Sequence, residues 1–146
     1  MIVSRTPYRI SLFGGGSDYP AWYRRNGGKV CGFAINKYCY ISIRQLPPFF
    51  EHKHRIVYSA IELVNDTAEV QHPSVRAILQ QEEPQVGLEI HHDGDLPARS
   101  GIGSSSSFTV GMLNAYSAFC GRMIDKRQLA ENAIHLEQEV IQEHVG

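Results

Sequence analysis

The segment Asp95-Leu-Pro-Ala-Arg-Ser-Gly-Ile-Gly-Ser-Ser-Ser-Ser-Phe108 decides how this chain folds and what it binds. A predicted strand over Val86–His91 precedes it, and a predicted helix over Ser105–Cys120 begins inside it. Gly101 and Gly103 permit a tight turn and a close approach of the backbone to a ligand. Because the first N–H groups of a helix have no partner inside the helix, a serine-rich first turn favours a phosphate-binding site.

Neither of the two standard phosphate-binding loops matches this segment. A Walker A loop would end in Gly-Lys-Ser/Thr, and a dinucleotide-binding fingerprint needs a third glycine where this chain has Ser106. Phosphate binding would therefore rest on backbone N–H groups and on serine hydroxyls, one of which could also ligate Mg²⁺. The alternative is a flexible Gly/Ser loop with an ordinary helix cap. The order of strand, loop and helix favours the phosphate site.

Hydrophobic periodicity predicts the remaining elements. Strict alternation places Cys39, Ile41 and Ile43 on one face of the clearest strand. We predict strands at Tyr8–Phe13, Lys29–Ile35, Lys37–Arg44, His54–Ser59 and Val86–His91, a turn near Asn36, and helices at Pro73–Glu83, at Ser105–Cys120 and after an Asp125 N-cap with Gln128 three residues on. Strands first and paired helices last predict a two-layer α+β fold, with residues 1–146 as one domain.

A second glycine cluster lies in Arg9-Ile-Ser-Leu-Phe-Gly-Gly-Gly-Ser-Asp-Tyr-Pro20. The glycines Gly14–Gly16 end the predicted strand and expose backbone N–H groups. At the rim, the carboxylate of Asp18 could accept hydrogen bonds from two sugar hydroxyls. A plain turn, with Asp18 as the turn former, accounts for the same residues equally well.

One acidic residue, Glu137, has an unexpected position on the last predicted helix. On a helical wheel it falls inside the apolar arc, which is formed by Leu129, Ala133, Leu136 and Val140. A buried carboxylate needs a partner or a metal ion, and Mg²⁺ commonly takes one or two carboxylates together with substrate phosphates. The alternatives are an ion pair with an arginine in the core, or an apolar face narrower than the wheel suggests.

Composition and charge narrow the classes of function. The chain has 146 residues, 42% of them hydrophobic, and a formal net charge of −1, so it lacks the basic excess that binds a nucleic-acid backbone. No apolar run is long enough to span a membrane, and the start is unlike a signal peptide. The spacing of Cys31, Cys39 and Cys120 fits neither a zinc site nor a redox pair. We therefore expect buried, reduced thiols in a soluble cytoplasmic protein.

Taken together, the two glycine segments resemble the motifs of the GHMP kinases. Thr6–Tyr19 is similar to the first motif of that family, and Pro97–Ser107 is similar to the second, the ATP phosphate loop, in the same order and at a similar separation. The form Gly-Gly-Gly-x-Asp-Tyr-Pro is most similar to the D-glycero-D-manno-heptose 7-phosphate kinase branch. Galactokinases carry Glu-His where this chain has Gly15-Gly16, which argues against galactose as the substrate.

The resemblance implies a fold, cofactors and roles for individual residues. The expected fold is that of ribosomal protein S5 domain 2, followed in the family by a second α+β domain that this chain would lack. The implied cofactors are ATP and Mg²⁺, with Ser105 and Glu137 as metal ligands and with Arg9 as the catalytic cation near the reacting hydroxyl. The sugar would contact Gly15, Gly16 and Asp18. The residues that would bind ATP are Pro97, Ser100, Gly101, Ile102, Gly103, Ser104, Ser105 and Ser106.

These implications lead to one main hypothesis. The chain would be the N-terminal, ATP-binding part of a kinase that transfers the γ-phosphoryl group of ATP to a sugar hydroxyl, the anomeric one. The catalytic acid of the family would follow Gly146, so we expect little or no turnover from this chain alone. It would act on small molecules, without a nucleic-acid or membrane partner, as a homo-oligomer or with a complementing C-terminal half. The alternative is an inactive nucleotide- or protein-binding module derived from such a kinase.

Overall fold

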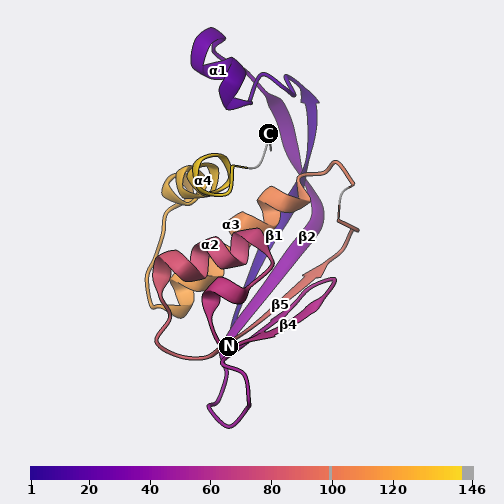
Figure 1. The fold of residues 1–146 in the computed structure, drawn as a ribbon. Coiled ribbons are helices and arrows are strands. Elements are labelled where there is room, and N and C mark those ends of the chain that lie inside the picture. The colour runs from indigo at the N-terminus through magenta and orange to yellow at the C-terminus, as the bar shows by residue number, and fades with distance from the viewer. Residues whose placement is uncertain (99, 143–146) are drawn as a thin grey trace.

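The computed structural model describes residues 1–98 and 100–142. A mixed sheet has the strand order β1-β2-β5-β3-β4. The helices α2 and α3 lie over one of its faces, and α4 packs against α3 (Figure 1). The strands are β1 (Ile2–Phe13), β2 (Cys31–Gln45), β3 (His54–Val57), β4 (Ile61–Val64) and β5 (Leu88–Gly94). The helices are α1 (Pro20–Asn26), α2 (Pro73–Glu82), α3 (Ser104–Phe119) and α4 (Lys126–His135), with the short η1 (Thr67–Glu69) and η2 (Leu136–Val140). The predicted two-layer α+β fold is confirmed.

The pairing of the strands places β5 in the middle of the sheet. β1 with β2, β2 with β5 and β3 with β4 pair antiparallel, whereas β3 and β5 are parallel. A parallel pair needs a crossover connection, and α2 lies in the segment that joins β3 to β5. The loop that follows β5 therefore leaves the centre of the sheet and leads into α3.

The predicted turn near Asn36 is wrong, because β2 continues through it. β2 pairs with β1 at both ends, with Ser42 opposite Val3 and Phe33 opposite Ile10. The register shifts between Pro7 and Arg9, so the residues around Asn36 form an irregularity in a long strand instead of a turn. We call the part beyond this shift, residues 9–13 and 31–34, the distal ribbon. It carries α1 away from the other helices (Figure 1).

The core lies between the sheet and the helices that cover it. Cys39, Ile41 and Ile43 are fully buried, as the alternation predicts. The other side chains that fill it come from both layers and include Val75, Ile78 and Leu79 of α2, Leu88 and Ile90 of β5, and Phe108, Met112 and Tyr116 of α3. In the part of the chain that the structure describes, no helix has the length and apolar character needed to cross a membrane.

The three cysteines are free thiols, but the expected burial holds for one of them. Cys39 is buried under the helices, whereas Cys31 and Cys120 are exposed. Cys31 lies on the distal ribbon, which the helices do not cover, and Cys120 follows the last residue of α3. Burial raises the pKa of the Cys39 thiol to about 12, so this thiol stays protonated at neutral pH.

The last helix begins as predicted and ends differently. Asp125 Oδ1 accepts a hydrogen bond from the Gln128 N–H at 2.9 Å, which confirms the N-cap. From Leu136 the chain forms a π-turn, in which the Ile141 N–H donates to the Leu136 carbonyl oxygen at 2.9 Å. The wider turn shifts the later side chains around the helix. Ile141 therefore packs against the core, whereas Val140, which the wheel placed on the apolar face, is exposed.

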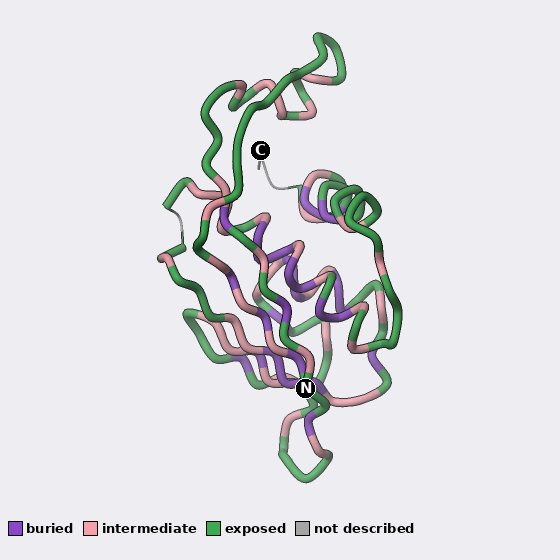
Figure 2. Tube along the Cα trace, turned by 180° about the vertical axis from the view of Figure 1, so that it is seen from behind, coloured by how far each residue is buried: buried purple, intermediate pink, exposed green. Residues whose placement is uncertain are grey.

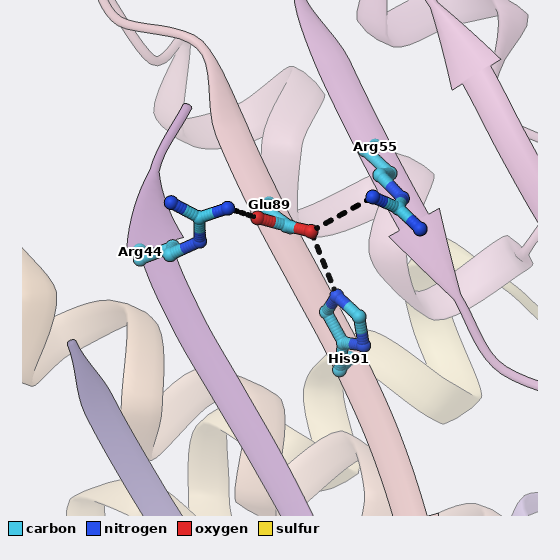
Figure 3. A network of polar contacts seen from close by, with 4 residues as sticks. All are labelled: Arg44, Arg55, Glu89 and His91. Atoms are coloured by element: carbon cyan, nitrogen blue, oxygen red, sulfur yellow. Dashed lines mark hydrogen bonds and ion pairs between the residues drawn. The ribbon is translucent and has the colours of Figure 1, made fainter. Parts of the chain in front are cut away.

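The face of the sheet away from the helices carries a polar network centred on Glu89 of β5 (Figure 3). Arg44 and Arg55 form ion pairs with its carboxylate, and His91 Nε2 lies 2.9 Å from Glu89 Oε1. The hydrogen bond with His91 and the charge of Arg44 hold the pKa of Glu89 below its usual value, although burial opposes them. These contacts link three adjacent strands across the open face.

Candidate active site

The loop between β5 and α3 has the backbone geometry that its glycines predict. Gly101 and Gly103 adopt left-handed conformations, with φ of 75° and 73°. The Ser107 N–H donates to the Gly103 carbonyl oxygen at 2.9 Å and begins the ladder of α3. In such a first turn, backbone N–H groups point along the helix axis toward any anion placed at its end. Ser100 Oγ also donates to the Pro97 carbonyl oxygen at 2.8 Å, which stabilises the loop internally.

Arg9 of β1 lies against this loop. Its backbone N–H donates to the Ile102 carbonyl oxygen at 3.0 Å, and its Nη1 lies 3.5 Å from the Gly101 carbonyl oxygen. A Cβ built on Gly103 would lie 3.2 Å from three atoms of the Arg9 side chain. Glycine at this position therefore lets the arginine pack closely on the loop. The structure brings a cation from the first glycine segment onto the second.

Glu137, which the helical wheel singled out, is buried beside the serine turn. It is 6% exposed, and Ser106 Oγ donates to its Oε2 at 3.1 Å. The hydrogen bond comes from Ser106, whereas Ser105 is exposed and lines a neighbouring pocket. The role of Ser105 as a metal ligand stays a prediction. The first turn of α3 and the π-turn η2, which carries Glu137, thus meet at one carboxylate.

The neighbouring pocket has a volume of about 500 Å³ and opens beside Ser104 and Ser105. Its aromatic walls are Tyr8, Tyr58, His72, His92 and Phe108. Sequence reasoning missed this pocket because these side chains come from five separate segments that only the fold brings together. One signal was available: His92 follows Leu88 and Ile90 in the alternation of β5, so it faces the helices.

The rings in this pocket pack on one another in an ordered way. His72 stacks on Phe108 with ring centroids 4.3 Å apart, and His92 meets the edge of Phe108 at 5.1 Å. On the other side of His72, Tyr58 makes an edge contact at 4.9 Å and donates its hydroxyl proton to Glu62 Oε1 at 2.8 Å. Burial lowers the pKa of His72 and of His92, so both imidazoles are mainly neutral at pH 7.

The turn over Gly14–Asp18 closes on itself at the end of the distal ribbon. The Gly16 N–H donates to Asp18 Oδ1 at 2.8 Å, and Ser17 Oγ donates to the Gly14 carbonyl oxygen at 2.7 Å. Asp18 therefore acts as a turn former, one of the two roles that the sequence allows. A Cβ on Gly14 would lie 1.9 Å from the Lys29 carbonyl oxygen, whereas Gly15 and Gly16 have open space beside them. Binding of a sugar at this turn stays a prediction.

A protein-family model described as the GHMP kinases N terminal domain matches residues 55–146, which include the serine turn, most of the pocket and Glu137. The chain belongs to the GHMP kinases. Within this family it is 24% identical to the D-glycero-alpha-D-manno-heptose 7-phosphate kinase of Campylobacter jejuni, over 94% of this chain and 43% of that protein. It is 27% identical to the galactokinase of Thermotoga maritima, over 94% of this chain and 39% of that protein.

Solved structures of GHMP kinases have the same fold. A D-glycero-D-manno-heptose 1-phosphate kinase from Bacteroides thetaiotaomicron superposes with a TM-score of 0.82 at 21% identity, over 100% of this chain and 51% of that one. A mevalonate kinase superposes with a TM-score of 0.73 at 19% identity, over 99% and 48% of the two chains. This GHMP kinase chain therefore spans about half the length of these structures.

The side chains of this GHMP kinase domain suit a metal that arrives with a nucleotide. Within residues 1–98 and 100–142, no group of three or more His, Cys, Asp or Glu side chains could hold an ion alone. The buried carboxylate of Glu137 and the adjacent serine hydroxyls are hard oxygen ligands, which Mg²⁺ prefers. Because Mg²⁺ commonly completes its octahedron with substrate phosphates and water, this small set fits Mg²⁺ bound with ATP.

Proposed function

We propose that this GHMP kinase domain binds Mg²⁺–ATP and forms the nucleotide half of a sugar kinase active site. The observation that carries the proposal is the buried carboxylate of Glu137, hydrogen-bonded to Ser106 in the first turn of α3. An acidic side chain beside the positive end of a helix suits a divalent cation shared with a triphosphate. The kinases named among its relatives support the same class of reaction.

The triphosphate would lie along the glycine loop and the first turn of α3. The loop is formed by Pro97, Ser100, Gly101, Ile102 and Gly103, and the turn by Ser104, Ser105 and Ser106. Backbone N–H groups and serine hydroxyls there would donate to phosphate oxygens. Ser105 and Glu137 would hold Mg²⁺, which neutralises charge on the β- and γ-phosphates when it is bound.

The aromatic pocket beside the serine turn suits the purine ring of ATP. Its volume of about 500 Å³ lies in the range of small-molecule sites. The aromatic side chains of Phe108 and of the neutral His72 and His92 would give a base an apolar wall to lie against. This placement would direct the triphosphate from the pocket, past Ser104 and Ser105, toward Glu137.

The acceptor sugar would lie at the Gly14–Asp18 turn, with Arg9 between it and the glycine loop. The sugar hydroxyl oxygen would form the bond to the γ-phosphorus as the bond to the leaving ADP breaks. The guanidinium of Arg9 would stabilise the charge that develops on the transferred group. The hydroxyl proton would pass to an acid–base group in the part of a GHMP kinase that this chain does not span.

We propose a heptose 7-phosphate as the acceptor, phosphorylated on its anomeric hydroxyl. The open space beside Gly15 and Gly16 leaves room for a sugar larger than a hexose. A relative from Campylobacter jejuni is named as a kinase of such a substrate. This assignment depends on the sugar turn alone and is separable from the proposed nucleotide site.

A second candidate function is a non-catalytic module that binds nucleotide or protein. The observation that favours it is the apolar surface of the distal ribbon, which exposes Leu12, Phe13 and Phe33. That surface would suit a second copy of the chain or a complementing C-terminal half.

Calorimetric titration with ATP, with and without Mg²⁺, tests the nucleotide site. We expect Mg²⁺ to raise the affinity for ATP, and we expect Glu137→Ala and Ser105→Ala each to remove most of that gain, a loss of about tenfold or more because a metal ligand is deleted. Glu131→Ala, which deletes an exposed acid on α4, is the matched control. ATP binding that ignores Mg²⁺ and both site variants would leave the non-catalytic module as the better reading.

A coupled assay of ADP release with Mg²⁺–ATP and heptose 7-phosphate tests catalysis. We expect little or no turnover from this chain, because the group that accepts the hydroxyl proton would lie outside it. Sustained turnover would show that residues 1–146 already contain every catalytic group and would refute the division of the site between two halves.

A further inference from the structure

The π-turn η2 presents Glu137 and two further polar residues to different neighbours. It is closed by the hydrogen bond from the Ile141 N–H to the Leu136 carbonyl oxygen, and Gln142 follows it in a left-handed conformation with φ of 58°. A π-turn is rare in helices, and a positive φ is uncommon for a residue other than glycine. Such a turn persists when contacts outside the helix favour it over the ordinary α-helical register.

Two of those contacts come from α1. Tyr23 Oη donates to Gln138 Oε1 at 2.9 Å, and the guanidinium of Arg24 forms an ion pair with Glu139. Gln138 and Glu139 directly follow Glu137, so α1 holds the two residues next to the proposed metal ligand. On the opposite side, Ser106 of α3 holds the Glu137 carboxylate itself.

Apolar burial does not explain these contacts, because none of the residues of α1 is buried. The helix begins two residues after Asp18, at the end of the distal ribbon. Its polar contacts with η2 tie this otherwise separate segment to the helices of the core. They join residues that are 115 positions apart in the sequence, so no local preference produces them.

We infer that Tyr23 and Arg24 are positioning residues that set the direction of the Glu137 carboxylate through η2. The inference rests on the proposed function of Glu137 as a ligand of Mg²⁺ bound with ATP. Without the two contacts, Gln138 and Glu139 are no longer held, and the backbone that follows Glu137 can shift. The carboxylate would then lose its fixed place beside Ser106, and the metal would bind more weakly.

The test measures the affinity for ATP by calorimetry with and without Mg²⁺. Its readout is the ratio of the affinity with Mg²⁺ to the affinity without it. Arg24→Glu, Glu139→Arg and Tyr23→Phe should each lower the ratio by roughly threefold, because each removes one exposed or partly buried polar contact. The double variant Arg24→Glu with Glu139→Arg restores opposite charges and should recover the ratio. Binding of metal-free ATP and the melting temperature should change little, which a general loss of folding would not allow.

Two controls separate the possible results. Arg25→Glu makes the same change of charge on α1 at a residue that pairs with no acid among the described residues, and it should leave the ratio unchanged. Glu137→Ala should abolish the gain from Mg²⁺. If it does not, the proposed metal site is wrong and the inference falls with it.

If Glu137→Ala abolishes the gain while Arg24→Glu and Tyr23→Phe behave like Arg25→Glu, the metal site stands and the inference alone is overturned. Failure of the charge-swapped pair to recover the ratio also overturns it.

Discussion

The two ends of the β1–β2 ribbon have the same pairing and opposite surroundings. At the sheet end, Ile41 and Ile43 are fully buried beneath α3. In the distal ribbon, Phe13 is 73% exposed and Phe33 is 50% exposed. Figure 2 shows this end of the ribbon mostly in the green of exposed residues. Both regions are apolar strands, so strand propensity does not distinguish them. What differs is whether helices cover the strand.

The covered end of the ribbon supplies stability to this domain, whereas the distal ribbon supplies exposed surface for other contacts. Residues under the helices contribute buried apolar area, which is the main favourable term in folding. The distal ribbon and α1 contribute little of it, and they reach the core through polar contacts with the loop and with η2. The proposed sugar turn lies on this less buried part, and the proposed nucleotide site lies at the edge of the core.

The largest expected effect comes from truncating an apolar side chain at the buried end. Ile41→Ala should lower the free energy of unfolding by about 2–5 kcal/mol, because it removes buried methyl groups and leaves a cavity. Phe33→Ala, the matched change on the distal ribbon, should change the free energy of unfolding by no more than about 0.5 kcal/mol. Urea unfolding followed by circular dichroism measures both. Equal losses would show that the ribbon is buried in solution.

Acid should have an intermediate effect on the free energy of unfolding, and the effect should come from the buried histidines. Burial lowers the pKa values of His54, His72 and His92 below the ordinary value of 6.5. Below pH 6.5 the unfolded chain therefore binds more protons than the folded one, and the free energy of unfolding falls as the pH drops toward the folded pKa values. Above pH 6.5 this slope fades, because the histidines of the unfolded chain also lose their protons.

Urea midpoints measured at pH 8, 7, 6 and 5 check this expectation. His72→Phe keeps a flat ring against Phe108 and removes one titrating group, so its midpoint should fall less steeply with acid than that of the parent chain. Glu89 acts in a separate window: its pKa is lowered from 4.5, so its stabilising ion pairs are lost only at lower pH. A stability that does not change between pH 7 and pH 5 would contradict the burial of the histidines.

The smallest effect leaves stability unchanged and concerns two thiols on the same strand. Cys31 is exposed on the distal ribbon, whereas Cys39 is 0% exposed and its pKa is raised to about 12. An aromatic disulfide reagent at pH 8 should therefore react quickly with Cys31 and Cys120 and reach Cys39 only after unfolding. Cys31→Ser should remove one rapid equivalent and Cys39→Ser none. Rapid reaction of all three thiols would mean that the buried end opens readily.

Local sequence patterns predicted the elements that carry most of the site. The periodicity of the predicted helix Pro73–Glu83, the N-cap at Asp125 and the glycine-rich entry to α3 depend on neighbouring residues. The structure confirms all three, with α2 ending at Glu82. The burial of Glu137 also followed from its place on the helical wheel. Patterns of this kind are reliable because they express the fixed periods of helices and strands.

Other features were missed because they depend on contacts between distant segments. α1, β4 and the first half of β1 gave no clear pattern, and β2 was divided at Asn36 although its ladder with β1 continues. The π-turn left Val140 exposed, although the wheel placed it on the apolar face. Ser106, and not Ser105, forms the hydrogen bond with Glu137, because the exact approach of two helices selects the partner.

The sequence alone determined the α+β class, the glycine loop that opens α3 and the membership in the GHMP kinases. Each of these depends on a periodic pattern or a motif within a short segment. Only the tertiary structure decided which strand end is covered, which serine meets Glu137 and which rings line the pocket. Those outcomes depend on packing between residues far apart in the chain, and packing is a property of the whole fold.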